Sequence, residues 1–163
     1  MRLIIACDNK GGIGFENKLP WGFGQKDDLK RFQEITNGHC VMMGRKTFES
    51  LPGLLKDRVH IVISTTMNPQ PGILVVRSVS AAKNIVELLK TPVFLIGGAD
   101  MVRQFIDAVD EIYLTKIKGE FEADAFFDLK QLDNFRLVYN ESFEANERNT
   151  HPYVFQTWRR SYF

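Results

Sequence analysis

The chain has 163 residues, of which 44% are hydrophobic and 25% are charged, and its formal net charge is +1. This length suits one domain over residues 1–163 with a sizeable core, and the composition is typical of a soluble globular protein. A nearly neutral chain has no electrostatic reason to bind nucleic acid or an acidic membrane, so we expect neither as a partner.

The chain begins with a short apolar run over residues 3–7, which predicts a buried strand. This run ends in the polar residues 8–10 and is too short for a signal peptide, and no apolar run approaches membrane-spanning length. Cys7 and Cys40 lie in apolar runs without the spacing of a metal site or a disulfide framework. The lack of a disulfide framework favours a reducing compartment, so we expect a cytoplasmic protein. The histidines also lack ligand spacing, so we expect no metal site.

A glycine-rich loop follows over residues 11–21. Three glycines within residues 11–14 give the backbone freedom, and Leu19-Pro20-Trp21 then places a large aromatic ring beside a stiff residue. One interpretation is a mobile lid over a cleft. The alternative is a surface loop whose tryptophan covers the core.

The next segment predicts a helix over residues 25–36 that carries one acid on its apolar face. Asp28, Phe32 and Ile35 are spaced as i, i+4 and i+7, so they share a face. The opposite, solvated face takes Asp27, Lys30, Arg31 and Glu34. A carboxylate in an apolar stripe is costly to bury unless a positive or hydrogen-bonding group meets it, which makes Asp28 a candidate functional acid. The alternative is an ordinary first-turn acid that the helix dipole stabilises.

Apolar runs alternate with helical patterns along the rest of the chain. Strands are predicted at residues 40–43, 59–64, 73–76, 93–96 and 111–117, and helices at 46–51, 80–89 and 100–106. Residues 135–143 and 153–159 predict a terminal antiparallel hairpin. This alternation predicts an α/β fold with a mostly parallel sheet, helices on both faces and an antiparallel C-terminal end. No heptad repeat or spare apolar helix face is evident, so we expect a monomer.

Two strand-to-helix junctions are candidate phosphate sites. Residues 44–47 (Gly-Arg-Lys-Thr) combine free backbone N–H groups at a helix start with two cations. Residues 96–99 (Ile-Gly-Gly-Ala) form a second junction, and ligands collect outside the carboxyl ends of parallel strands. The alternatives are a tight turn with basic surface residues and a plain glycine turn.

Four motifs, in order and in register over nearly the whole chain, resemble dihydrofolate reductases. They are Ile13-Gly14-x-Glu16-Asn17-x-Leu19-Pro20-Trp21, Asp28-Leu29-x-x-Phe32, Met43-Gly44-Arg45-Lys46-Thr47-Phe48-Glu49-Ser50 and Ile96-Gly97-Gly98. The resemblance implies the dihydrofolate reductase fold and NADPH as the cofactor. It also implies reduction of dihydrofolate to tetrahydrofolate, by hydride transfer to C6 and protonation of N5 from solvent.

The resemblance implies a pterin site around Asp28, with Thr115 hydrogen-bonded to this acid. Leu19 and Trp21 would belong to the lid that excludes water. Arg58 would bind the carboxylate of the glutamate tail of folate, a task that suits a guanidinium. The implied substrate-binding residues are Ile4, Ile5, Ala6, Asp28, Leu29, Phe32, Leu51, Leu55, Arg58, Ile96 and Thr115.

The resemblance also implies a cofactor site at both junctions. Residues 44–47 would bind the phosphates of NADPH, residues 64–66 would contact the adenosine end, and a cis peptide would join Gly97 and Gly98. The implied cofactor-binding residues are Ala6, Ile13, Gly14, Gly44, Arg45, Lys46, Thr47, Ser64, Thr65, Thr66, Arg77, Ile96, Gly97, Gly98, Ala99, Met101 and Val102.

The chain departs from the family pattern at three cofactor or loop positions. Val102 stands where bacterial members often have a tyrosine against the nicotinamide. Asp100 stands where a base is common, so we expect a weaker preference for NADPH over NADH. Ala125 replaces a common threonine, which should loosen one loop interaction.

Compared with the commonest spacing in bacterial members of the family, the chain has two extra residues between Trp21 and Asp28. This difference raises the question whether Asp27 or Asp28 is the pocket acid. The Asp-Leu-x-x-Phe register and the helical face both favour Asp28. Two other functions stay open, namely a related pterin or pyrimidine reductase of the same fold and a nucleotide-binding module without catalysis.

Overall fold

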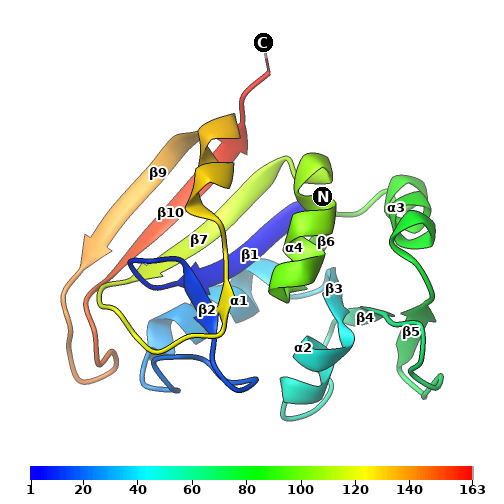
Figure 1. Cartoon of the computed structure of the whole chain (residues 1–163), viewed down its shortest axis with the longest axis horizontal. Coiled ribbons are helices and arrows are strands. Elements are labelled where there is room, and N and C mark those ends of the chain that lie inside the picture. Colours follow the sequence, from blue (N-terminus) through cyan, green and yellow to red (C-terminus); the bar gives the residue numbers. More distant parts are fainter. Residues whose placement is uncertain (163) are drawn as a thin grey trace.

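An eight-stranded sheet forms the centre of the computed structural model, which describes residues 1–162 (Figure 1). Its strands follow the order β5-β4-β3-β6-β1-β7-β10-β9. They are β1 (Arg2–Cys7), β3 (Cys40–Gly44), β4 (Val59–Ile63), β5 (Ile73–Val76), β6 (Val93–Gly97), β7 (Glu111–Ile117), β9 (Phe135–Phe143) and β10 (Tyr153–Arg160). A separate small sheet pairs β2 (Gly12–Gly14) with β8 (Ala125–Phe126).

Neighbouring strands run parallel from β5 to β7, and the β9–β10 hairpin adds antiparallel strands at one edge. The pairing of β1 with β7 extends from Arg2 opposite Glu111 to Cys7 opposite Lys116. This arrangement confirms the predicted α/β fold. Because parallel strands end at the same edge, the carboxyl ends of β1, β3, β4 and β6 gather there.

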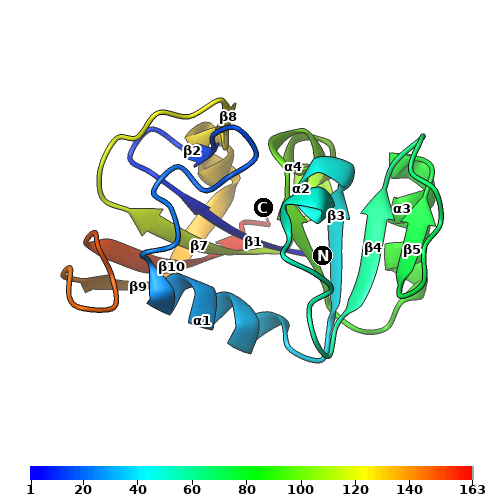
Figure 2. The same cartoon turned by 90° about the horizontal axis from the view of Figure 1, so that it is seen from below.

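Helices cover both faces of the sheet. They are α1 (Lys26–Thr36), α2 (Arg45–Ser50), α3 (Val79–Leu88) and α4 (Ala99–Phe105). Phe32 of α1 and Phe48 of α2 pack in the core cluster of one face, whereas Ala82 of α3 and Phe105 of α4 pack in that of the other. Figure 2 shows α1 on one side of the strands and the β2–β8 pair on the other. No helix within residues 1–162 is long and apolar enough to span a membrane.

The predicted helices and long strands agree with the structure to within one residue at each end. Helix α3 begins at Val79 rather than at residue 80, because the Ser78 hydroxyl caps it by accepting the Ala81 N–H at 3.0 Å. The sequence pattern does not reveal β2, β8 or the 3₁₀ helices η1 (Ile106–Ala108) and η2 (Leu129–Asn134). These elements are too short to show a hydrophobic period of their own.

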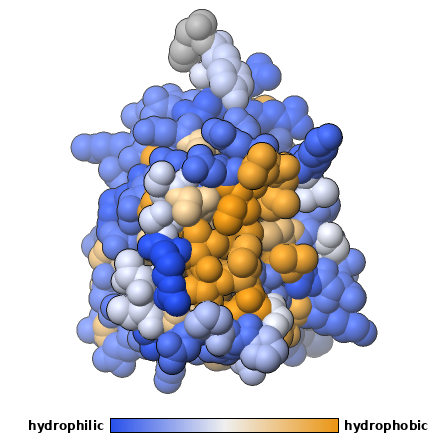
Figure 3. All heavy atoms as spheres, turned by 90° about the vertical axis from the view of Figure 1, so that its right-hand side faces the viewer, coloured by the Kyte–Doolittle hydropathy of each residue, from blue (hydrophilic) through white to orange (hydrophobic). Residues whose placement is uncertain are grey.

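Exposed apolar side chains gather on the side of the molecule that carries β5 and α3 (Figure 3). Val59 of β4, Leu74 of β5 and Leu88 of α3 are all exposed, and Leu88 keeps 80% of its accessible area. The sequence pattern does not reveal this surface. The expectation of a monomer therefore no longer rests on the absence of a spare apolar face.

Candidate active site

Asp28 lies in the first turn of α1, where its partly buried side chain meets the sheet. Burial raises the pKa of its carboxyl, whereas a hydrogen bond with the Thr115 side chain and the positive charge of Arg31 lower it. Thr115 is buried in β7 and pairs with Ala6 of β1. The acid on the apolar face of the predicted helix therefore has a specific partner in the sheet.

An apolar cluster adjoins this acid on the same face of the sheet. It includes the predicted residues Ile4, Phe32, Leu51, Leu55 and Ile96. Leu29 is 38% exposed and so lies outside the packed core. Ile5 belongs to the cluster on the opposite face, so its side chain does not join the others. Strand alternation explains this, because Ile4 and Ala6 point to one face and Ile5 to the other.

Trp21 and Leu19 pack in a third cluster, together with Ala6 of β1 and Phe121. The Trp21 ring is 8% exposed and meets the Phe121 ring edge-on, with 6.1 Å between the centroids. The alternative that this tryptophan covers the core is thus confirmed, while movement of the loop stays a prediction. Within residues 1–162 the buried indole N–H of Trp21 has no hydrogen-bond partner. A donor of this kind is available to a bound molecule.

The loop of Trp21 is also tied to the β8 region. The backbone N–H of Glu16 donates to the Asp124 carboxylate at 2.9 Å, and the Asp124 N–H donates to the Gly14 carbonyl at 2.9 Å. Ala125 pairs with Gly14 across the small sheet. The two hydrogen bonds of Asp124 and this strand pairing therefore keep the loop attached although Ala125 lacks a hydroxyl.

Arg58 lies at the rim of a hollow of about 660 Å³. Its guanidinium donates to the Thr36 hydroxyl at 3.0 Å, the Lys56 carbonyl at 2.6 Å and the Gln33 carbonyl at 3.0 Å. Leu55 lines this hollow and also packs in the apolar cluster beside Asp28. The hollow therefore continues from the apolar cluster to a fixed positive charge.

The two predicted phosphate junctions lie side by side. α2 begins at Arg45 after β3, α4 begins at Ala99 after β6, and β3 pairs with β6. The expected cis peptide between Gly97 and Gly98 is present. A Cβ added at either glycine would lie 3.5 Å from the Thr47 hydroxyl, and one at Gly44 would lie 3.2 Å from the Met101 side chain. Of these three glycines, only Gly44 would be crowded by a Cβ. The free backbone N–H groups at the two helix starts fit a cofactor with phosphate groups.

Two arginines connect the first junction to the end of β4. Arg45 donates to Glu49 at 2.6 Å and to the Thr66 hydroxyl at 2.9 Å. Arg77 donates to the carbonyls of Ser64 at 3.1 Å and Met67 at 2.6 Å. The structure therefore brings together most of the residues expected at the adenosine end, with Lys46 and Thr65 exposed beside them.

The structure shows the surroundings of two residues that depart from the family pattern, Val102 and Asp100. Val102 is 3% exposed and packs in the core cluster beside Phe105. Asp100 forms an ion pair with Arg103, one turn later in α4. The negative charge that Asp100 brings to this junction is therefore partly offset.

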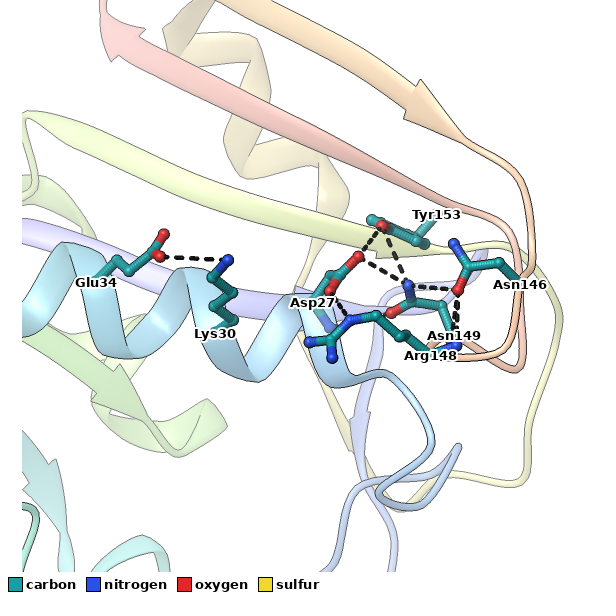
Figure 4. Close-up of polar contacts among 7 residues, drawn as sticks. All are labelled: Asp27, Lys30, Glu34, Asn146, Arg148, Asn149 and Tyr153. Atoms are coloured by element: carbon teal, nitrogen blue, oxygen red, sulfur yellow. Dashed lines mark hydrogen bonds and ion pairs between the residues drawn. The ribbon is translucent and has the colours of Figure 1, made fainter.

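The prediction that Asp27 lies on a solvated face is wrong. Figure 4 shows its carboxylate within a polar network formed by the β9–β10 connection and the first residue of β10. It accepts hydrogen bonds from the side chains of Arg148, Asn149 and Tyr153, each at 2.9 Å. These bonds, led by that from Asn149, lower the pKa of Asp27. Lys30 and Glu34 do lie on the exposed face, where they form an ion pair at 3.8 Å (Figure 4).

The prediction that Arg31 lies on this solvated face is also wrong. Its guanidinium donates to the carbonyls of Leu114 in β7 and Gln156 in β10, both at 3.1 Å. Only one signal in the sequence could have placed it, namely its i+3 spacing from Asp28, which makes them neighbours on the helix surface.

Comparisons with known proteins agree with this geometry. The family model described as dihydrofolate reductase matches residues 1–160. A dihydrofolate reductase of Staphylococcus aureus is 33% identical over 159 residues, covering 95% of this chain and 94% of that protein. A type 9 dihydrofolate reductase of Escherichia coli is 34% identical over 166 residues, covering 97% and 92%.

A solved structure supports the same assignment. It is the dihydrofolate reductase of Enterococcus faecalis complexed with NADP(H) and RAB-propyl, with a TM-score of 0.87 and 32% sequence identity. The match covers 98% of this chain and 95% of that one. The chain therefore belongs to the dihydrofolate reductase family.

Proposed function

We propose that this protein reduces 7,8-dihydrofolate to 5,6,7,8-tetrahydrofolate with NADPH. The observation that carries the proposal is the partly buried Asp28 carboxyl, which contacts Thr115 beside an apolar cluster. A flat heterocycle with hydrogen-bond donors along one edge matches this combination, because the ring fills the apolar space and its edge satisfies the acid. The NADP(H) bound by the Enterococcus relative supports the choice of cofactor.

Asp28 would bind the N3 and 2-amino edge of the pterin. A carboxylate at this edge raises the basicity of the ring, so that water can protonate N5. Thr115 would orient the carboxyl through its hydrogen bond. Leu19 and Trp21 would exclude bulk water from the ring, and the free indole N–H would donate to a molecule bound beside Asp28.

The junctions after β3 and β6 would hold the cofactor. When bound, NADPH supplies the hydride that adds to C6 of the pterin. The backbone of residues 44–47 and 97–99 would donate to its phosphates, and Arg45 would lie near the 2′-phosphate. Ser64, Thr66 and Arg77 would form the adenosine end of the site.

Arg58 would bind the α-carboxylate of the glutamate tail. Its three anchoring hydrogen bonds fix the guanidinium before any substrate arrives, which reduces the entropic cost of binding. Each terminal nitrogen keeps a further N–H to donate, and the adjacent hollow offers room for the tail.

A spectrophotometric assay of NADPH oxidation with and without dihydrofolate tests the proposal. We expect oxidation only when dihydrofolate is present, and a higher kcat/KM with NADPH than with NADH. Activity with a different pterin or a pyrimidine alone would instead indicate a related reductase. Binding of NADPH without oxidation under any of these conditions would indicate a nucleotide-binding module.

We further propose that residues 1–163 act as a single cytoplasmic domain without nucleic-acid or membrane partners. The nearly neutral charge supports this setting. A monomer is the simplest state. Because an apolar surface is exposed near β5 and α3, the oligomeric state has to be measured. Size-exclusion chromatography over a range of protein concentrations should show one elution volume, at the 18.7 kDa mass of a single chain.

A further inference from the structure

Arg31 is a cation inserted between α1 and the sheet. Besides the carbonyls of Leu114 and Gln156, it reaches the Thr157 hydroxyl at 3.5 Å. The guanidinium carbon lies 4.6 Å from the centre of the Phe155 ring and 5.8 Å from that of Tyr113. Two strands of the sheet, β7 and β10, therefore hold one planar side chain from the helix.

The contacts of Arg31 reach the partner of the pocket acid directly. The Leu114 carbonyl belongs to the peptide group that continues into Thr115, and the Thr115 side chain bonds Asp28. Asp28 and Arg31 are one turn apart on α1, so the helix segment between them is fixed to β7 at both ends. A displacement of Arg31 would thus move the acid relative to its hydroxyl partner.

Burying the Arg31 charge costs desolvation free energy, which a neutral side chain packed in the same place would not cost. Burial lowers the pKa of Arg31, which shows that the site disfavours the charge. Within residues 1–162, no carboxylate lies within ion-pair distance of the guanidinium. A neutral side chain of similar length would fill the same space without this desolvation cost.

We propose that Arg31 is a positioning residue for the reduction. It clamps the turn of α1 that carries Asp28 onto β7 and β10, and it keeps a fixed positive charge one helical turn from the pocket. This inference rests on the proposed role of Asp28 in binding and activating the pterin.

The charge of Arg31 has a defined target. The titratable groups that face it are Asp28 on its own helix, Tyr113 of β7 and Tyr139 of β9. Both tyrosines have raised pKa values and stay neutral near pH 7; burial is the main cause for Tyr113, and a hydrogen bond to Glu141 for Tyr139. Asp28 is therefore the acid on which the Arg31 charge acts, and this charge lowers its pKa against the effect of burial.

The sign of the functional effect follows from this charge. A nearby cation makes protonation harder, both for Asp28 and for a pterin bound against it. Removing the cation should make protonation easier, so the pH above which the rate falls should move upward. The ratio of the Arg31→Gln rate to the wild-type rate should then rise with pH and become constant above both midpoints.

The pH dependence of kcat in three variants tests the proposal. Arg31→Gln should shift the midpoint to higher pH, whereas Arg31→Lys should keep the wild-type midpoint but lower kcat, because it keeps the charge without the planar fork. Lys30→Gln is the matched control, since Lys30 loses the same charge from the exposed face of the same helix. A midpoint for Arg31→Gln equal to that of the wild type would overturn the proposal, as would an equal shift in Lys30→Gln.

Two further measurements separate possible failures. If Arg31→Gln does not fold, Arg31→Met, whose neutral side chain can pack on the Phe155 ring in place of the guanidinium, should give the same shift. Asp28→Asn should remove the wild-type midpoint and leave only the rise in rate at low pH that comes from substrate protonated by solvent. If it does not, the proposed role of Asp28 fails and the Arg31 inference with it; if it does while neutral Arg31 variants keep the wild-type midpoint, the Arg31 inference alone is refuted.

Discussion

Asp27 and Asp28 are consecutive residues in the first turn of α1, but their carboxylates have opposite surroundings. Asp27 accepts hydrogen bonds from two side chains of the β9–β10 connection and from Tyr153 at the start of β10, which lower its pKa. Asp28 faces the sheet, where burial raises its pKa and its direct partner is a single hydroxyl. The number of donors around each carboxylate, rather than its position in the helix, thus distinguishes Asp27 from Asp28, the acid for which we propose a role in the reaction.

The strongest test of this difference is the activity of Asp28→Asn. Asparagine keeps the shape but not the charge, so we expect kcat to fall at least about 100-fold at neutral pH. At low pH more substrate is protonated from solvent, so the variant should recover in part. Steady-state assays across pH measure both effects, and a fluorescence titration should show unchanged NADPH binding. A crippled Asp27→Asn beside a mild Asp28→Asn would reverse the assignment of the two acids.

The Arg58→Leu variant tests whether the substrate binds with its pterin at Asp28 and its glutamate tail at Arg58. Loss of a desolvated charge pair should weaken dihydrofolate binding by about 2–4 kcal/mol. A pterin without the glutamate tail should bind this variant nearly as well as it binds the wild type. Because Arg58 also anchors Thr36 and Gln33, the two ligands must be compared in the same variant. Equal losses for both would show that Arg58 acts through the fold.

Asp27→Asn should affect stability rather than catalysis. Three side-chain donors lose a charged acceptor, so we expect a loss of about 1 kcal/mol, or a few degrees in Tm. A carboxylate with a lowered pKa stabilises the fold above its unfolded pKa, and this contribution disappears as pH falls through the folded value. The difference in Tm should therefore vanish in acid. Asp133→Asn, at an exposed position of η2, is the control and should leave Tm unchanged.

Asp28→Asn should shift stability in the opposite direction. A carboxyl with a raised pKa binds more protons in the folded state, so the wild type loses stability as pH rises from the unfolded to the folded value. Removing the charge should raise Tm at neutral pH by the equivalent of about 1 kcal/mol and change it little in acid. Thermal unfolding at several pH values measures this. A lower Tm for Asp28→Asn than for the wild type at neutral pH would mean that the buried carboxylate is fully satisfied.

Local sequence was sufficient for the order and bounds of the long strands and helices. Apolar runs and i, i+4, i+7 spacing report average burial, and this average survives whatever the distant partners are. The same spacing was sufficient for the inward position of Asp28, and glycines were sufficient to mark both strand-to-helix junctions. Four motifs in register identified the family, because each motif is a short continuous segment that can be recognised without knowing the fold.

Only the tertiary structure decided which polar side chains have partners. Asp27 meets Asn149 and Tyr153, which are 122 and 126 residues away in the chain, so no local period could reveal its network. Arg31 looks solvated from its helical position, because periodicity cannot show that carbonyls of β7 and β10 lie within reach. Hydrogen bonds and charges act over a few ångströms between segments far apart in sequence. Their satisfaction is therefore a property of the folded molecule alone.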